Sequence, residues 1–247
     1  MTARCRSLLL ETGVQARCVA GGYFLANSLP RPRYLSTRLP DHLLSASPCI
    51  VEMLPDLLGI PPWSSRGKEK WETELGLDHR RLPEVALWVE ERIAAQEIAW
   101  GSVFFSTQIA RDFLKLLGLS GNQMGLLGIA LPERHVASFQ QDSVRPDYPI
   151  LPGVNLMLRR GRPLDSGAKL LGYEVLGWEL PDFHTWLCYD FEKDAYEKLG
   201  LSPNCDGFID TLDNAEKLAE YATLREPKAG EVHLWLPWLV ASYALEA

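Results

Sequence analysis

The chain has 247 residues, of which 47% are hydrophobic and 23% are charged, and its net charge is −7. This composition is close to that of ordinary globular proteins and excludes a collagen-like, coiled-coil or largely disordered chain. No apolar stretch reaches 18 residues in length, and Glu11 interrupts the N-terminal leucines before they form a signal peptide, so we expect a cytoplasmic protein without a membrane span.

The first elements in chain order are a strand, a loop and a helix. β-Branched and aromatic residues around two adjacent glycines predict a strand over 17–27, with a bulge or a close backbone approach at the glycine pair. Three prolines in 29–43 remove backbone donors and predict an extended loop. Residues 48–58 predict the start of a helix that Pro55 limits, and a clearer amphipathic helix follows Pro83.

The middle of the chain repeats the order of strand and helix. A short strand at 103–105 leads into a helix that ends at Gly118, and a buried run at 126–131 leads into a polar helix after Pro132. Segments 154–160 and 168–179 are both β-like and are joined by a polar turn. They predict an antiparallel hairpin.

Two helices are predicted in the last third. Pro181 and Asp182 indicate the start of the first helix, and Gly200 suits its left-handed end. The second helix carries a capping box formed by Asp213 with Glu216.

The final segment and the overall order of elements indicate the fold class. Residues 231–245 are rich in β-branched and aromatic side chains, but Pro237 predicts an edge strand or a broken strand there. Strands and helices mix without strict alternation, so we predict an α+β fold: a mixed, largely antiparallel sheet with helices packed on it. We expect a single domain over 1–247, within which 1–150 and an acidic 151–247 are the candidate lobes.

Negative charge gathers in the last third of the chain. From Leu171 to Ala247 there are 15 acidic and five basic residues, a net charge of −10, which leaves +3 for residues 1–170. Such a surface disfavours nucleic acid, because phosphates are bound by Lys and Arg, and it suits a basic protein partner. A solvated surface that aids solubility is the simpler explanation.

Motifs of known catalytic and cofactor-binding classes are missing from the sequence. There is no P-loop, no dinucleotide glycine fingerprint and no H-E-x-x-H helix, and the segment around Ser120 lacks the second glycine of a nucleophile elbow. The five cysteines show neither C-x-x-C nor zinc-ligand spacing, so we expect reduced thiols, no metal and no cofactor. These absences favour a function without catalysis, so we assign no catalytic residue in the hypothesis that we favour below.

His184 and Cys188 form the one constellation that suits a reaction. On a helix beginning at Asp182 they would share a face, where the imidazole would lower the pKa of the thiol and make it a nucleophile. We favour the alternative, in which Cys188 packs among aromatic neighbours as a small hydrophobic residue. A general acid and base pair of carboxylates near Glu174 is a further alternative.

Aromatic residues in the acidic third indicate a docking surface. Tryptophan and tyrosine dominate interface hot spots because they bury a large area at low entropic cost. The residues predicted to contact a partner are Trp178, Glu179, Asp182, Tyr189, Asp190, Glu192, Asp194 and Trp238. The alternative is that the rings fill the core, which we expect for Trp186 and Trp235.

Four segments carry a resemblance to a known group of proteins. They are G-Y-E-x-x-G-W at 172–178, H-T-W-L-C at 184–188, Asn204 with Gly207, and L-W-L-P-W-L at 234–239. These segments resemble bacterial immunity-like proteins associated with secreted polymorphic toxins. The resemblance implies a protein that binds a cognate toxin and occludes or distorts its active site.

Three function hypotheses follow. The leading one is an immunity-type protein that neutralises a cognate toxin, a basic one such as a nuclease, through the acidic and aromatic last third. The second is a hydrolase that uses Cys188 with His184, or a carboxylate pair that includes Glu174. The third is a structural or assembly subunit.

Overall fold

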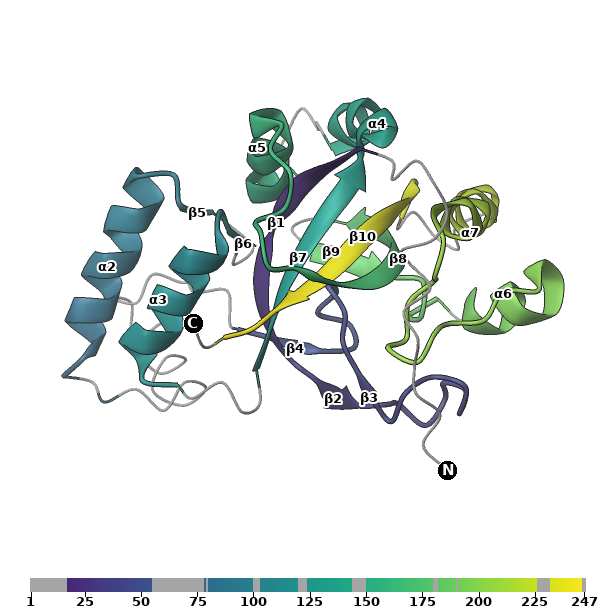
Figure 1. Cartoon of the computed structure of the whole chain (residues 1–247), viewed down its shortest axis with the longest axis horizontal. Helices are drawn as coiled ribbons and strands as arrows, with labels where there is room; N and C mark the ends of the chain where they lie inside the picture. The colour runs from purple at the N-terminus through teal and green to yellow at the C-terminus, as the bar shows by residue number, and fades with distance from the viewer. Residues whose placement is uncertain are drawn as a thin grey trace.

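The computed structural model describes residues 17–54, 78, 80–99, 103–119, 124–143, 150–179, 182–189, 191–225 and 232–245. In this part of the chain, six helices pack on a largely antiparallel sheet of eight strands, which confirms the predicted α+β class (Figure 1). None of the helices in the described ranges combines the length and the apolar character that a membrane span requires.

The strand β10, which comes last in the order of elements, lies in the middle of the sheet. Its order is β5-β6-β1-β7-β10-β8-β9, and β4 also pairs with β1. The long strands are β1 (Cys18–Asn27), β7 (Met124–Pro132), β8 (Lys169–Glu179) and β10 (Trp235–Tyr243). The short strands are β4 (Glu52–Met53), β5 (Ile98–Ala99), β6 (Val103–Phe104) and β9 (Asp182–Thr185). A separate two-stranded ribbon consists of β2 (Leu29–Pro30) and β3 (His42–Leu43).

Helices cover both faces of the long strands (Figure 1). They are α2 (Leu82–Ala94), α3 (Thr107–Leu117), α4 (Glu133–Ser143), α5 (Pro152–Arg160), α6 (Phe191–Leu199) and α7 (Leu212–Leu224). Phe139 of α4 packs against Trp238, whereas Phe191 of α6 packs against Trp235. Side chains alternate along a strand, so Trp235 and Trp238 point to opposite faces of β10. The helices α4 and α6 therefore lie on opposite faces of the sheet.

Several predictions from the first half of the chain are confirmed. Strand β1 carries the predicted bulge, because its register against β7 shifts between Ala20 and Gly22, where Gly22 has a φ of +139°. Helix α2 follows the predicted pattern and buries Val85 and Val89. Helix α3 ends at Gly118, whose φ of +70° is the left-handed conformation predicted for it.

The predicted hairpin of 154–160 with 168–179 is wrong in its first half. Residues 152–160 form α5, which buries Val154, Met157 and Leu158, positions that lie three and four residues apart. The same residues fit a short apolar strand, and periodicity does not distinguish the two structures in so short a segment. The second half is the strand β8, as predicted.

The prediction of an edge or broken strand around Pro237 is also wrong, since β10 pairs with β8 on one side and with β7 on the other. Pro237 lies opposite Val175 of β8, whose carbonyl accepts from Trp186 N at 3.0 Å. The Val175 backbone therefore faces β9 and needs no hydrogen bond from Pro237. On its other side β10 pairs with β7 only from Leu239 onward, so the missing N–H breaks no ladder bond.

Candidate functional site

The segment that contains His184 and Cys188 is a strand and a turn, which makes the prediction of a helix from Asp182 to Gly200 wrong. Residues 182–185 form β9, pairing with β8 so that His184 lies opposite Gly177. Their burial alternates, since Phe183 and Thr185 are buried while Asp182 is exposed, and this is the pattern of a strand with one face inward. The helix α6 begins only at Phe191 and ends before Gly200, as predicted for that end.

A loop that is distant in the sequence, residues 45–49, packs against β9, which is the edge strand of the sheet. The loop residues Ser45 and Ala46 bind the Glu174 carboxylate, with Ser45 Oγ donating at 2.5 Å and Ala46 N at 3.0 Å. Further along, Ser47 Oγ donates to the Phe183 carbonyl at 2.7 Å. These bonds satisfy polar groups at the edge and hold the loop 45–49 against β8 and β9.

The loop brings Cys49 to His184, although 135 residues separate them in the chain. Cys49 Sγ lies 3.4 Å from His184 Nδ1, and Glu179 Oε2 lies 3.8 Å from His184 Nε2. Glu179 stands two residues from Gly177 on β8, so its side chain shares the face on which His184 sits. A thiol, an imidazole and a carboxylate therefore follow one another in the order nucleophile, base and orienting group.

The surroundings of Cys49 favour its thiolate form. The contact with the Cys188 side chain, followed by the one with His184, lowers the pKa of Cys49 against the opposing effect of partial burial. The hydrogen bond to Cys49 in turn raises the pKa of His184. Cys49 is exposed, whereas Glu179 and His184 are partly exposed, so the three groups are open to a reactant.

Cys188 differs from Cys49 in burial and in ionisation. It lies in the turn 186–189, where its backbone N donates to the Thr185 carbonyl at 2.9 Å. Its contact with Cys49 and its burial both raise the pKa of the Cys188 thiol. Both cysteines carry free thiols. The pair therefore shares one negative charge, which rests on Cys49 because that residue is exposed and adjoins His184.

Aromatic side chains support the imidazole ring of His184 where it packs on the sheet. Tyr189 meets His184 edge to face with centroids 5.8 Å apart, and it meets Trp235 in the same way at 5.2 Å. Gly177 leaves no side chain between these rings, and a Cβ there would lie 3.0 Å from Trp235. The imidazole therefore has a packed support on the sheet.

A shallow pocket lies where residues 34–38 meet helix α6. It has a volume of about 240 Å³ and is lined by Tyr34, Leu35, Ser36, Arg38, Glu192, Lys193, Tyr196 and Glu197. Burial raises the pKa of Tyr34, and charge on Cys188 and Cys49 raises it further. Arg38 lies 3.6 Å from the centre of the Tyr196 ring and 3.8 Å from Glu192. The pocket is smaller than those that hold drug-sized ligands, so it suits a small group or a side chain.

The predicted partner-binding residues occupy different environments. Trp178 and Trp238 are only 3% and 0% exposed, so both are core residues. Glu192 and Asp194 are also buried, and Asp194 pairs with Lys198 at 3.1 Å and with Arg225 at 2.8 Å. Asp182 is exposed, Glu179 and Tyr189 are partly buried, and Asp190 lies outside the described residues. The prediction that Trp186 and Trp235 lie in the core is confirmed.

The structure changes the residues that would carry the two reactions suggested by the sequence. Cys188 and His184 do meet at one site, but the group that touches the imidazole is Cys49, which the sequence did not single out. Glu174 is 2% exposed, and its carboxyl group binds the loop 45–49 through Ser45 and Ala46. Burial raises the pKa of this carboxyl. Cys205 is disulfide-bonded, so the prediction of reduced thiols is wrong for this residue.

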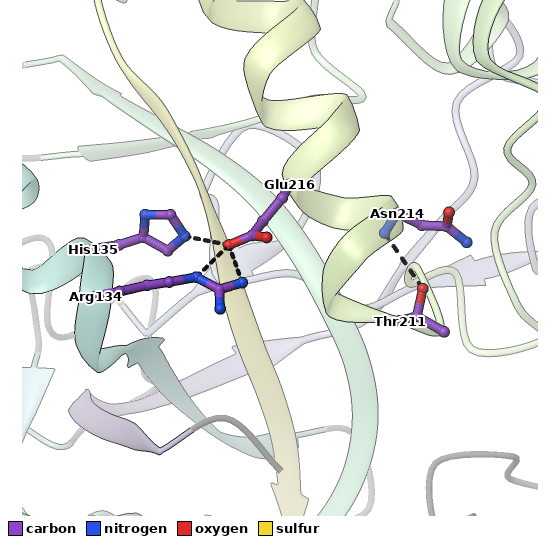
Figure 2. A network of polar contacts seen from close by, with 5 residues as sticks. All are labelled: Arg134, His135, Thr211, Asn214 and Glu216. Atoms are coloured by element: carbon purple, nitrogen blue, oxygen red, sulfur yellow. Dashed lines mark hydrogen bonds and ion pairs between the residues drawn. The ribbon is translucent and has the colours of Figure 1, made fainter. Parts of the chain in front are cut away.

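A second polar cluster joins α4 to α7 (Figure 2). Glu216 of α7 accepts from Arg134 Nε at 2.7 Å and contacts His135 Nε2 at 2.6 Å. The predicted capping box of Asp213 with Glu216 is therefore wrong, because the Glu216 carboxylate binds α4 instead. Thr211 caps α7, and its hydroxyl accepts from Asn214 N at 3.3 Å. This cluster is an ion-paired contact between helices.

No protein-family model, no curated protein and no solved structure matches this chain. Among the described residues, no group of three or more His, Cys, Asp or Glu side chains is arranged to hold a metal ion.

Proposed function

We propose that the protein is a thiol-dependent acyl hydrolase or transferase in which Cys49 is the nucleophile. The observation that supports this proposal is the chain of contacts from Cys49 Sγ to His184 Nδ1 at 3.4 Å and from His184 Nε2 to Glu179 at 3.8 Å. Nucleophile and base contacts of this kind are often longer in a protein without substrate than during the reaction.

Each residue has a distinct role in the proposed reaction. The Cys49 thiolate attacks the carbonyl carbon of an acyl substrate, and the protonated His184 donates its proton to the departing group. The Cys49 thioester that forms is then cleaved by water, from which neutral His184 takes a proton. Glu179 orients the ring through Nε2 and stabilises the imidazolium.

The pocket lined by Tyr34 and Tyr196 suits a small acyl donor. The two tyrosines at its wall, Tyr34 and Tyr196, are exposed and offer apolar faces, and the Arg38 guanidinium lies over the Tyr196 ring. A volume of about 240 Å³ accommodates a short acyl chain or one amino-acid side chain.

Hydrolysis of p-nitrophenyl acetate tests the proposal. We expect a burst of p-nitrophenol, close to one equivalent per protein, followed by slower turnover, because the Cys49 thioester forms faster than it is cleaved. Cys49→Ser should abolish the burst, and His184→Gln should slow it by about a hundredfold or more. Glu179→Gln should slow it less, since Glu179 acts through the ring.

Cys18→Ser is the matched control, because Cys18 lies on β1 and burial raises the pKa of its thiol to about 11. This variant should keep the full burst. An equal burst from the wild type and from Cys49→Ser, with both proteins folded by circular dichroism, would refute the proposal.

Neutralisation of a cognate toxin is a second proposal, and it is supported by charge and by exposed rings. Residues 171–247 carry a net charge of −10, and Tyr34 and Tyr196 are 69% and 45% exposed beside Glu197. Exposed tyrosines beside acidic side chains suit docking onto a basic protein. Co-expression with the product of the neighbouring gene tests it. The absence of both protection from toxicity and a co-purified complex would refute it.

A further inference from the structure

Cys49 contacts both His184 and Cys188, and the acyl chemistry uses only His184. His184 Nδ1 lies 3.4 Å and the Phe183 carbonyl oxygen 4.0 Å from its sulfur, while the side chain of Cys188, in the turn that follows β9, contacts the same sulfur. Cys188 is partly buried and sits in the turn that directly follows β9, so it approaches Cys49 from the edge of the sheet. The proposed hydrolysis gives this second thiol no task.

We propose that Cys49 and Cys188 form a peroxide-driven redox pair, in which a hydroperoxide oxidises Cys49 and Cys188 closes the product to a disulfide. The inference rests on the proposed function, because both need a nucleophilic Cys49. It adds a second reaction at the same sulfur, with a hydroperoxide as oxidant.

The first step oxidises Cys49 by two electrons. The thiolate attacks the terminal oxygen of the hydroperoxide, so an S–O bond forms while the O–O bond breaks. The departing alkoxide, or hydroxide from hydrogen peroxide, takes the proton of the His184 imidazolium and leaves as an alcohol or water. Cys49 is then a sulfenic acid, and the peroxide has been reduced by the same two electrons.

The second step uses the thiol that already contacts Cys49. The Cys188 sulfur attacks the Cys49 sulfur, an S–S bond forms and the S–O bond breaks. The departing hydroxide takes up the Cys188 proton and leaves as water. The sum of both steps converts two thiols and one hydroperoxide into a disulfide, an alcohol and water.

The two cysteines have the properties that this order requires. The attacking thiol is exposed, and hydrogen bonds favour its thiolate, which is the form that reacts with peroxides. The resolving thiol is protonated and shielded, so a peroxide reaches Cys49 first. Cys18 has no comparable position, because it lies on β1 and burial raises its pKa to about 11.

Peptide mapping after treatment with hydrogen peroxide tests the pair. The protein is reduced, desalted, exposed to a small excess of peroxide in the presence of dimedone and digested. From the wild type we expect a peptide that links Cys49 to Cys188 and that dithiothreitol releases. Cys188→Ser should lose this peptide and instead carry dimedone on Cys49, because serine donates a hydrogen bond but forms no disulfide. Cys18→Ser should behave as the wild type.

Activity provides a second measurement. Peroxide should remove the p-nitrophenol burst of the wild type, and dithiothreitol should restore nearly all of it. In Cys188→Ser without dimedone, excess peroxide should carry Cys49 on to sulfinic acid, so that dithiothreitol restores little. A wild type whose Cys49 is trapped by dimedone with no link to Cys188 overturns the redox pair and leaves the acyl reaction standing. A Cys49 that resists both iodoacetamide and peroxide overturns both proposals.

Discussion

At the scale of single residues, the environment of each thiol matters more than its place in the sequence. Burial raises the pKa of Cys18 to about 11, whereas hydrogen bonds from Cys188 and His184 lower the pKa of Cys49. Burial disfavours the charged form of a thiol, and a donor at the sulfur favours it. Among the free cysteines that the structure describes, Cys49 is therefore suited to reaction, whereas Cys18 and Cys188 are protected from it.

The pH dependence of alkylation follows from these shifts. The pKa of Cys49 is lowered, so its reaction with iodoacetamide should change little between pH 9 and pH 6. Replacing His184 by Gln removes one of the stabilising contacts and raises the pKa of Cys49. The rate at pH 6 falls about tenfold below that of the wild type for each unit by which the pKa of Cys49 in the variant exceeds 6. The measurement is the second-order rate constant on the Cys18→Ser background, with Cys49 followed by mass spectrometry.

A Cys49 rate that falls steeply between pH 9 and pH 6 in the wild type would contradict this prediction, because an ordinary thiol pKa is about 8.5. Cys49→Ser supplies the background rate of the remaining thiols.

At the scale of elements, the sequence predicted segments with a clear period and failed where several structures fit the same residues. The stripe of α2 and the glycine stop of α3 depend on local geometry alone, and both are confirmed. Pro181 and Asp182 resemble a helix start, so the sequence alone predicts a helix over residues 182–185. The backbone partners that make them a strand lie on β8, at positions fixed only by folding.

The site was predictable only in part, for a similar reason. His184 and Cys188 were identified from their proximity in sequence, and both belong to the site. Cys49 was not, because no spacing rule connects residues that are 135 positions apart. Its neighbours Ser45 and Ser47 offered a weak signal, since hydroxyls around a proline favour a fixed turn with side-chain to backbone bonds.

The ion-paired contact of Glu216 with Arg134 and His135, which joins α7 to α4, makes the free energy of unfolding depend on pH. Burial alone would raise the pKa of Glu216, but bonds from Arg134 and His135 outweigh burial and lower it. A lowered carboxyl pKa contributes stability above the unfolded value of 4.5, and this contribution is lost as pH falls through the folded value. Glu216→Gln should therefore cost on the order of 1 kcal/mol at pH 7.

Urea denaturation of Glu216→Gln and the wild type between pH 7 and pH 3 measures this effect. The difference in unfolding free energy should shrink as the pH falls below 4.5, because the wild-type carboxyl then becomes neutral as well. Glu220→Gln, an exposed position one turn further along α7, is the matched control and should differ little from the wild type. A difference that does not change with pH would exclude the ion-paired contact as its source.

At the scale of the whole molecule, Glu174 joins the core of the sheet to the reactive loop. It lies on β8 opposite Trp238 of β10, and its carboxylate binds Ser45 and Ala46, which stand 129 and 128 residues away in the chain. The loop that these bonds hold ends in Cys49. The distance between Cys49 and His184 thus depends on a buried carboxyl on the other face of the sheet.

Replacing Glu174 separates its structural role from its charge. Glu174→Ala leaves the hydroxyl of Ser45 and the N–H of Ala46 without their acceptor, which should lower the free energy of unfolding by about 1–3 kcal/mol or more. It should also weaken the p-nitrophenol burst, because the loop that carries Cys49 loses its anchor. Glu174→Gln keeps an oxygen for Ala46 N and an amide that donates to Ser45, so it should keep both the fold and the burst.

The pH dependence of the same pair of variants tests the ionisation of Glu174. Burial raises the pKa of this carboxyl above its ordinary value of 4.5. The folded protein therefore holds the proton more tightly than the unfolded chain does, and this contribution to stability is fully present below pH 4.5 and is lost as pH rises through the folded pKa. Glutamine resembles the protonated carboxyl and does not titrate. The stability of Glu174→Gln relative to the wild type, measured by urea denaturation, should accordingly increase from pH 4 to pH 8, whereas a constant difference would show that the buried carboxyl does not change its charge in that range.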